Sequence, residues 1–503
     1  MDALTGLAQG FAVALEPVNL LYLMIGVTVG TVIGLLPGIG PALTIAMLLP
    51  LTSKIDPASA FIMFAGIYYG AMYGSSTTSI LVNTPGESTS VVTAIEGHQM
   101  ARRGRGGAAL ATAAIGSFVA GTLAAAGIMF LSPVLVKVAL DFGPAEYFAL
   151  MVLALTTVSG FASSSIARTV VSMFLGMAFG LVGIDLQTGQ PRFTLGVPEL
   201  LDGIDIVNLA VGLFGVGEVL WIAATLRHQG AALVSVSGSI WMTAQEWGRS
   251  WKPWLRGSLL GFGVGSLPAG GGEIPTFLSY NIEKRLSRHP EEWGKGAIEG
   301  VAGPEAANNA AVGGALLPLL TLGIPTSATA AIMLAAFNQY GLQPGPLLFR
   351  NSEALVWGLV ASLYLGNLAL LILNLPLIRI WVKMLDIPTP LLYSGILVFA
   401  TLGAYSLAAS VVDLTVMAIV GVLAYGMRRM DFPIAPLIVG AILGPRIEQE
   451  FRRALSVSLG DPTTFLTRPI SASIIAAAVL ILCAPRLISW WRGRQAVRPP
   501  INT

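Results

Sequence analysis

The dominant pattern along the chain is a series of long apolar runs that contain few charged residues. Such runs cover residues 354–378, 391–424 and 471–484, and Asp413 is the only charged residue among them. About 20 apolar residues are enough for an α-helix to cross a bilayer. The runs are continuous rather than alternating, which is typical of helices in lipid and not of half-buried strands. The pattern predicts an all-α polytopic membrane protein with roughly ten to thirteen transmembrane or re-entrant segments.

Composition agrees with this pattern. Of 503 residues, 54% are hydrophobic and 11% are charged, whereas a soluble domain has about 25% charged residues. So few charged side chains leave large apolar surfaces uncovered, and these surfaces must face lipid. The basic residues are clustered at 102–105, 284–288, 428–429 and 492–498. The positive-inside rule predicts that these clusters face the cytoplasm.

Two kinds of interruption break the apolar pattern, and each kind occurs twice. Residues 30–41 read GTVIGLLPGIGP and residues 261–271 read GFGVGSLPAGG, so glycines and a proline recur at a constant offset. Residues 81–89 read LVNTPGEST and residues 322–329 read LGIPTSAT, with one proline opposite the other. Two matches in the same order favour an ancient internal duplication.

The duplication suggests a division of the chain. We expect a first transmembrane repeat at 1–226, an interfacial connector at 227–256, a second repeat with terminal helices at 257–490, and a basic cytoplasmic tail at 491–503. The connector combines polar residues with four tryptophans, which suits a helix lying along the lipid headgroups.

A basic loop follows the second interruption in the first half but the first interruption in the second half. If both loops are cytoplasmic, the two structural repeats are inverted.

The interruptions have a chemical meaning at membrane depth. Proline removes a backbone donor, and an unpaired backbone group in lipid costs several kcal/mol. Broken helices therefore occur where protein or a water-filled cavity satisfies the freed groups. A tight helix crossing is one explanation, but four paired breaks favour a binding site near the membrane midplane. There, unwound carbonyl groups suit a sodium ion, and helix N-termini suit an anion.

These roles give two sets of candidate residues. Neutral oxygen and amide groups at the second kind of interruption suit a carboxylate, although helix capping is an alternative role for them. The substrate-binding candidates are Asn83, Thr84, Pro85, Gly86, Ser88, Gly323, Pro325, Thr326, Ser327, Asn308 and Asn309. The sodium-binding candidates are Pro37, Gly38, Gly40, Pro268, Gly270, Gly271 and Thr329. We expect no other metal site and no catalytic residues.

Three carboxylates near these segments have two interpretations each. Glu87 is either a functional intramembrane acid or a group at the wet mouth of a hairpin. Glu273 either complements a helix N-terminus or binds an ion. Glu305 lies in the segment PEAANN at 304–309, where two adjacent amides favour a polar contact inside the bundle over a simple helix start. The nearby tyrosines are interpreted as packing or interfacial aromatics: Tyr68, Tyr69 and Tyr73.

The sequence lacks the motifs expected of an intramembrane enzyme or an ATP-driven pump. A serine nucleophile needs a base within hydrogen-bond reach, but the three histidines, His98, His228 and His289, lie in basic or polar connections. The chain contains neither an HExxH zinc motif nor a phosphate-binding P-loop. The alternatives to a transporter are therefore an intramembrane enzyme, which these facts disfavour, and a membrane scaffold, which would not need paired helix breaks.

Longer motifs carry a family resemblance. The segments GLLPGIGPALT, YYGAMYGSSTTSILVNTPGE with the following EGHQMARRGRGGAAL, and EGVAGPEAANNAAVGGALLPLLTLGIPTSATAAIML resemble the large membrane subunit of tripartite tricarboxylate transporters, the TctA family. The resemblance extends over about the whole chain in length and motif order. One departure is the segment LPAGGGE, where we expect a glycine directly after the proline. Ala269 and Glu273 are therefore candidates to alter ion or substrate preference.

The resemblance implies a bacterial inner-membrane secondary transporter of organic carboxylates, with citrate as the prototype. It implies symport with sodium and an elevator mechanism with helical hairpins. It also implies two partners, a small four-helix membrane subunit of the TctB type and a periplasmic solute-binding protein of the TctC type. No cofactor besides the coupling ion, and no nucleic acid, is expected.

Overall fold

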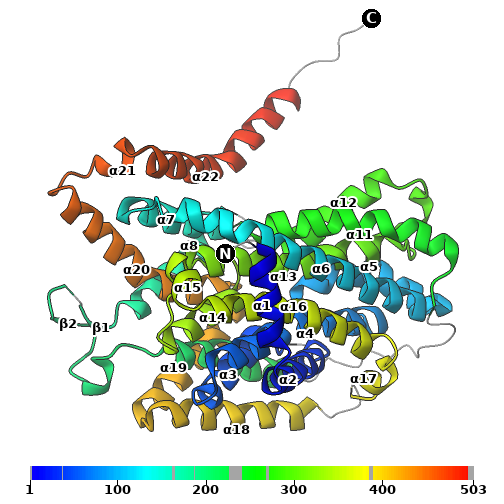
Figure 1. Ribbon diagram of the computed structural model, residues 1–503, viewed down its shortest axis with the longest axis horizontal. Helices are drawn as coiled ribbons and strands as arrows, with labels where there is room; N and C mark the ends of the chain where they lie inside the picture. Colours follow the sequence, from blue (N-terminus) through cyan, green and yellow to red (C-terminus); the bar gives the residue numbers. More distant parts are fainter. Residues whose placement is uncertain are drawn as a thin grey trace, which may run out of the picture.

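The computed structural model describes residues 3–36, 38–160, 165–185, 187–225, 241–267, 271–384 and 389–496 (Figure 1). This part of the chain is almost entirely helical, which confirms the expected all-α class. A single antiparallel pair of two-residue strands, β1 (Gly183–Ile184) and β2 (Pro191–Arg192), is the exception within the described residues. Among the described residues, five helical segments are long and apolar enough to cross a membrane, and six further apolar helices are shorter. The five are Pro17–Gly34, Ser88–Ala139, Ile206–Thr225, Glu353–Asn374 and Val411–Arg429.

The first half of the chain forms a series of helices that is interrupted by short 3₁₀ and π segments. The α-helices are α1 (Ala3–Ala14), α2 (Pro17–Gly34), α3 (Pro41–Thr52), α4 (Pro57–Val82), α5 (Val91–Met100), α6 (Gly106–Ala139), α7 (Pro144–Gly160), α8 (Ile166–Gly180), α9 (Ile206–Ala210) and α10 (Gly217–Thr225). The short segments are η1 (Ser88–Ser90), η2 (Ala101–Arg105), η3 (Pro198–Leu200) and η4 (Val211–Val216).

The second half begins, in the described residues, with a helix that runs through the expected end of the connector at residue 256. The helices are α11 (Ala244–Gly265), α12 (Glu273–Leu286), η6 (Pro290–Glu292), α13 (Glu299–Leu322), α14 (Ala328–Gln339), α15 (Pro346–Asn351), α16 (Glu353–Asn374), α17 (Ile378–Met384), α18 (Thr389–Ala408), α19 (Val411–Arg429), α20 (Ala435–Val457), α21 (Thr464–Thr467) and α22 (Pro469–Ala496). Residues 227–240 of the expected connector lie outside the described residues.

Helices α2 and α4 pack against each other at backbone distance. Glycines at every fourth position of α2 form one face, and a Cβ atom on any of them would collide with a backbone carbonyl of α4. Glycine is the one residue that permits this approach, at a cost to helix propensity. The glycines are Gly26, Gly30 and Gly34, and their partners are Met63, Ile67 and Ala71.

Helices α11 and α13 repeat this packing in the second half. The glycines of α11 lie at the same offset from those of α2 that the sequence comparison found, and their partners in α13 are offset equally from those in α4. The glycines are Gly257, Gly261 and Gly265, and their partners are Gly303, Ala307 and Ala311. The same contacts at matching positions are strong support for the internal duplication.

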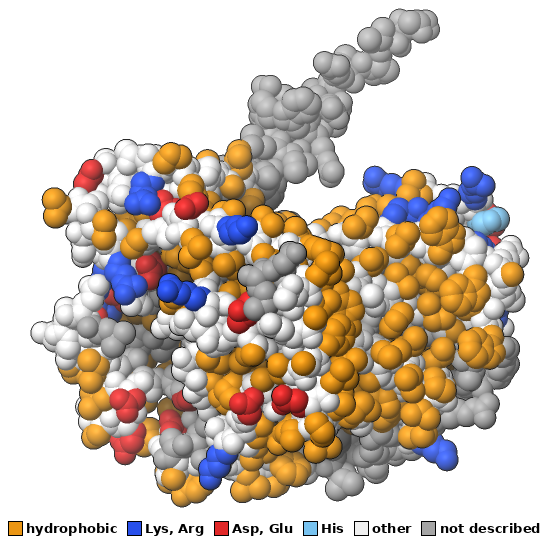
Figure 2. Space-filling model, viewed as in Figure 1, with side chains coloured by type: hydrophobic (Ala, Val, Ile, Leu, Met, Phe, Trp, Pro, Cys, Tyr) orange, Lys and Arg blue, Asp and Glu red, His pale blue; other side chains and the backbone are white. Residues whose placement is uncertain are grey.

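The surface agrees with a membrane environment. Large apolar side chains are exposed on several helices, among them Leu259 at 76%, Phe130 at 56% and Ile372 at 53% exposure. Figure 2 shows that hydrophobic side chains cover a broad continuous area of the viewed face, while basic side chains gather at its upper right edge. An exposed apolar surface of this kind marks a membrane or protein contact in a native protein.

Candidate functional site at four helix breaks

Each expected interruption coincides with the end of a helix. We define break 1 as residues 35–40 between α2 and α3, and break 2 as residues 83–87 between α4 and η1. Break 3 covers residues 266–272 between α11 and α12, and break 4 covers residues 323–327 between α13 and α14. Three candidate residues, Pro37, Pro268 and Gly270, lie outside the described residues.

Breaks 2 and 4 begin with the same backbone conformation. Helix α4 ends at Asn83, with φ 57°, and α13 ends at Gly323, with φ 69°. Both values are left-handed, which glycine adopts freely and asparagine tolerates better than other residues. A proline follows two residues later in each break, and its preceding residue is disfavoured in the helical region. Local sequence therefore explains why both helices end where they do.

Break 2 lies against the end of α2 and against break 1. Gly86 is buried, and a Cβ atom on it would collide with the carbonyl oxygen of Gly34, the last residue of α2. On the other side, the Oε1 atom of Glu87 lies 2.7 Å from the place that a Cβ atom on Gly40 would occupy. Glycine at both positions lets the first two breaks touch.

Break 4 makes the matching contact in the second half. The Thr326 hydroxyl donates a hydrogen bond of 3.0 Å to the carbonyl oxygen of Gly265, the last residue of α11. Thr326 aligns with Gly86, and Gly265 aligns with Gly34, so equivalent elements meet in both halves. Thr326 is 3% exposed, and its hydroxyl therefore satisfies a helix-end carbonyl that has lost its place in the helical ladder.

The two halves also meet each other at these breaks. The Ser88 hydroxyl, just after break 2, donates a hydrogen bond of 2.6 Å to Oε1 of Glu273, just after break 3. The Thr89 side chain lies against Gly272 at the end of break 3. The Tyr68 hydroxyl of α4 lies 3.0 Å from the Ser327 hydroxyl in break 4. We call the region around these contacts the junction.

The junction carries two carboxylates. Glu87 and Glu273 are close enough to influence one another and Tyr68 electrostatically. Glu87 is half-buried and Glu273 is exposed, whereas Tyr68 is only 6% exposed. In the part of the chain that the structure describes, neither acid forms an ion pair. An open region with two unpaired acids favours a cation there over an anion alone.

Helix α13 holds a further polar cluster. Glu305 is fully buried and accepts hydrogen bonds from the hydroxyls of Ser76, at 2.5 Å, and Thr93. The Asn309 amide donates to the Ser117 hydroxyl at 2.6 Å. The Asn308 amide lies beside Glu305, although neither of its polar atoms has a hydrogen bond of good geometry. These contacts confirm that the PEAANN segment makes polar contacts inside the bundle.

A cavity of about 10 Å³ adjoins this cluster and is lined by Tyr73, Ser76 and Ser117, among others. That volume is enough for roughly one water molecule or one small ion. The polar side chains in its lining are potential hydrogen-bond partners for such a particle.

Other predicted site residues lie elsewhere around the breaks. Gly38, with φ 86°, lies against the Glu218 carboxylate of α10, which forms an ion pair with Arg428 of α19. Asn83 is exposed, and the Thr84 hydroxyl contacts only its own segment, at 3.5 Å from the Val82 carbonyl. The remaining candidates lie in or next to breaks 3 and 4: Gly271, Gly323, Pro325 and Thr329.

The sequence reasoning missed the position of Tyr68. Tyr68 and Tyr73 are both buried, as expected of packing residues, but the Tyr68 hydroxyl reaches break 4 and the Tyr73 hydroxyl donates to Asn367 at 2.6 Å. Nothing in a single sequence distinguishes these tyrosines from ordinary packing residues, because their partners lie far along the chain.

The fold and the breaks together define a polytopic α-helical membrane protein in which interrupted helices of two related halves meet. A family model described as "Tripartite tricarboxylate transporter TctA family" matches residues 20–439. The chain therefore belongs to the TctA family, which confirms the resemblance seen in its motifs.

Two curated relatives come from Agrobacterium vitis. The chain is 48% identical over 494 residues to the "Uncharacterized 52.8 kDa protein in TAR-I ttuC' 3'region", covering 97% of this chain and 98% of the relative. It is 47% identical over 241 residues to the "Uncharacterized protein in TAR-II ttuC' 3'region", covering 48% of this chain and 98% of that relative. No solved structure gives a significant match.

Proposed function

We propose that this chain is the large permease subunit of a tripartite secondary transporter in the bacterial inner membrane. In this proposal it imports tricarboxylates or related organic carboxylates, driven by the sodium gradient. A periplasmic solute-binding protein delivers the substrate, and a small four-helix membrane subunit completes the assembly. The observation that carries the proposal is the contact between helix breaks of the two halves, because broken helices at membrane depth are where transporters bind their cargo.

The matched helix pairs support a pair of inverted repeats. The same glycine-to-carbonyl contacts occur in α2 with α4 and in α11 with α13. The basic loops follow different breaks in the two halves, which fits opposite orientations in the membrane. Transporters with this symmetry alternate access by moving one bundle against another around a fixed site, so we infer an elevator-type movement for this chain.

The carboxylates support a cation as the coupling species. An anionic substrate would be repelled by Glu87 and Glu273 unless a positive charge lay between them. Sodium prefers oxygen ligands of the kind that these acids, the nearby hydroxyls and unwound carbonyl groups provide. Glu305, buried without a described cationic partner, equally requires a bound cation or a proton, because an isolated buried carboxylate is too costly.

Neutral groups at break 4 suit the substrate. Ser327 caps α14 by accepting a hydrogen bond of 3.1 Å from the Ala330 amide, so the N-terminus of this 12-residue helix points its first amides toward the junction. A helix N-terminus carries partial positive charge and binds carboxylates. Break 4 therefore serves the substrate and break 2 serves the cation in this proposal.

Uptake of radiolabelled citrate into proteoliposomes tests the proposal. The vesicles should contain this chain with the small membrane subunit, and the binding protein should be added outside. We expect uptake that needs all three proteins and an inward sodium gradient, with a potassium gradient as the control. We also expect Glu305→Gln to raise the sodium concentration needed for half-maximal uptake.

The outcomes are distinct. Uptake without sodium would retain the transporter and reject the coupling. No uptake of citrate or of any other di- or tricarboxylate, with both partners present, would reject the function.

A further inference from the structure

A separate pocket lies between the loop that connects β1 to β2 and the outer part of α20. Its volume is about 320 Å³, which is in the range of small-molecule sites. The loop and α20 are brought together by close packing, because Gly176 and Gly180 of α8 lie against the backbone carbonyls of Leu437 and Ala441 in α20. The pocket wall is rich in arginine, with four arginines facing two acids.

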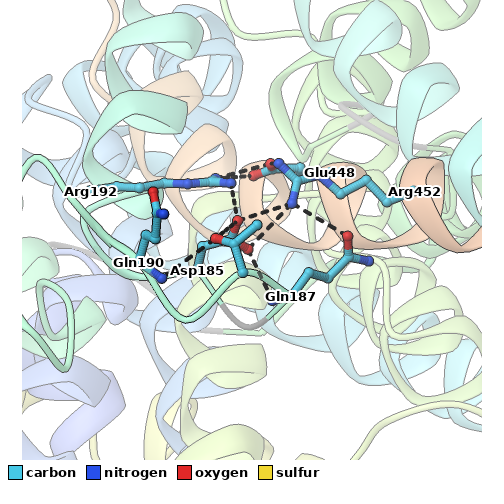
Figure 3. Close-up of polar contacts among 7 residues, drawn as sticks. Asp185, Gln187, Gln190, Arg192, Glu448 and Arg452 are labelled. Atoms are coloured by element: carbon cyan, nitrogen blue, oxygen red, sulfur yellow. Dashed lines mark hydrogen bonds and ion pairs between the residues drawn. The ribbon is translucent and has the colours of Figure 1, made fainter.

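Two of the arginines are fully committed to the two acids (Figure 3). Arg192 donates to both oxygens of Glu448, at 2.9 and 2.8 Å, and to Asp185 at 2.5 Å. Arg452 donates to both oxygens of Asp185, at 3.3 and 3.1 Å, and also pairs with Glu448. These four side chains therefore neutralise one another and form a rigid wall.

The Asp185 carboxylate is also held by its own loop. It accepts hydrogen bonds from the Thr188 hydroxyl at 2.7 Å and from the Gln187 backbone amide at 3.1 Å. These hydrogen bonds, together with the two arginines, hold the pKa of Asp185 well below its usual range. Asp185 therefore stays ionised near neutral pH, and it keeps both Arg192 and Arg452 occupied.

Arg446 is different, because in the part of the chain that the structure describes no acid forms an ion pair with it. Among the described residues its hydrogen-bond partner is a neutral group, the Asn338 side-chain oxygen, at 2.8 Å. Glu450 is near enough to act on it electrostatically but pairs with Arg453 at 3.2 Å. One guanidinium nitrogen of Arg446 lies 3.5 Å from the place of a Cβ atom on Gly323. Arg446, which lines the pocket, therefore also lies beside the first residue of break 4.

We propose that this pocket is a second binding site for a small organic anion that bears carboxylate groups, with Arg446 as its main receptor. A guanidinium group binds a carboxylate through two parallel hydrogen bonds, and Arg446 has donors that no carboxylate among the described residues uses. Arg453 also lines the pocket, but its charge is paired with Glu450. That the bound anion is the transported substrate rests on the proposed function.

The position of the pocket suits an arriving substrate. In Figure 1 the β1–β2 loop lies at the opposite end of the molecule from the loop that follows α12. The basic residues of that loop are expected to face the cytoplasm, so the pocket opens toward the periplasm in this orientation. A positive pocket there raises the local concentration of an anion beside break 4.

Citrate binding to the purified, full-length chain in detergent tests this inference. Calorimetry should be done without sodium and at constant ionic strength, so that the coupled site at the junction contributes least. We expect Arg446→Gln to raise the dissociation constant for citrate about tenfold or more. Arg446→Lys should raise it less, because lysine keeps the positive charge but cannot form the two parallel hydrogen bonds of a guanidinium group. Arg350→Gln, at an exposed position of α15 outside the pocket, is the matched control and should change it less than about twofold.

The inference fails if folded Arg446→Gln binds citrate as tightly as the unaltered chain. If that variant does not fold, hydrogen exchange of the unaltered chain gives the answer: citrate should slow exchange at residues 187–192, and unchanged exchange there would overturn the inference. Failure of the proposed function looks different, since citrate would still bind in an Arg446-dependent way although no uptake occurred.

Discussion

Break 2 and break 4 occupy equivalent places in the two halves but differ in their side chains. Both begin with a left-handed residue, both contain a proline at the same position, and both lie on the last residue of the neighbouring helix. Break 2 is partly exposed to solvent and contains Glu87, whereas the residue of break 4 that aligns with Glu87 is Ser327. The comparison teaches that glycine and proline fix the backbone of a broken helix, while the ligand groups remain free to diverge.

In the proposed function, this difference gives the two breaks separate roles. An acid in an open break suits a cation, and a hydroxyl with a helix N-terminus suits a carboxylate. If the assignment is right, equivalent substitutions in the two breaks should have unequal consequences.

The largest difference is expected between Gly86→Leu and Thr326→Leu. Leucine at residue 86 has no space, because even a Cβ atom collides with the Gly34 carbonyl, and forced overpacking costs about 1–3 kcal/mol or more. Residue 326 already holds a buried threonine, so leucine adds less volume there, and the replacement also loses one hydrogen bond. Citrate uptake per molecule and the midpoint of thermal unfolding should both fall much further for Gly86→Leu. Equal losses would show that the two breaks are packed alike.

The next prediction distinguishes the residue proposed to bind sodium from the residue proposed to bind the substrate. We expect Glu87→Gln to raise the half-saturating sodium concentration about tenfold, which corresponds to a loss of about 1.4 kcal/mol in sodium-binding free energy. The half-saturating citrate concentration should change much less. Ser327→Ala should show the reverse pattern, because it removes a hydroxyl from the proposed substrate site. Initial uptake rates over a range of both solutes measure this. A shift in the same constant for both variants would contradict separate roles.

A smaller effect concerns the hydrogen bond of break 4. Thr326→Val keeps the volume of the side chain and removes the donor to the Gly265 carbonyl, so the free energy of unfolding should fall by about 1 kcal/mol. Thr326→Ser keeps the hydroxyl and is the control. Thermal unfolding in detergent is the measurement, and identical midpoints for Val and Ser would show that the hydrogen bond contributes nothing.

The smallest effect is expected at the start of break 2. Asn83 adopts a left-handed conformation that glycine adopts without strain, so Asn83→Gly should change the free energy of unfolding by about 0.5 kcal/mol or less. Uptake should also be retained, because the exposed Asn83 side chain has no described hydrogen bond. A large loss of citrate affinity would instead place this amide in the substrate site, as the sequence suggested.

The sequence was informative about the breaks because glycine and proline act locally. At breaks 2 and 4, a proline two residues after the left-handed position disfavours continuation of the helix. At breaks 1 and 3, the glycines and prolines mark the ends of α2 and α11, although their capping residues, Leu35 and Ser266, are right-handed. The internal duplication could also be recognised, because the glycines that let two helices pack at backbone distance recur with the same spacing in both halves. The family motifs predicted a more specific function than the composition alone could.

Contacts between the halves could not be predicted in the same way. The hydrogen bonds from Ser88 to Glu273 and from Tyr68 to Ser327 join residues far apart in sequence, and they depend on how whole helices pack. The pocket beside Arg446 was missed for a related reason. Its residues on α20 read as an ordinary charged helix end, until the β1–β2 segment supplies Asp185 and Arg192, which pair with Arg452 and Glu448 of α20.

The central claim is that breaks of both halves meet in one site, and a disulfide across the junction tests it most directly. Thr89 lies in the first half and Gly272 in the second, with 3.2 Å between the Thr89 Cβ and the place of a Cβ on residue 272. A disulfide needs about 3.5–4.5 Å between its Cβ atoms, so a small outward shift of either segment brings the pair into range. The double variant Thr89→Cys with Gly272→Cys should be made with Cys483→Ser, which removes the one native cysteine. In native membranes we predict rapid intramolecular disulfide formation under mild oxidant, slowed by sodium together with citrate. Two thiols that stay free under oxidant, while each single variant reacts readily with maleimide, would contradict the account.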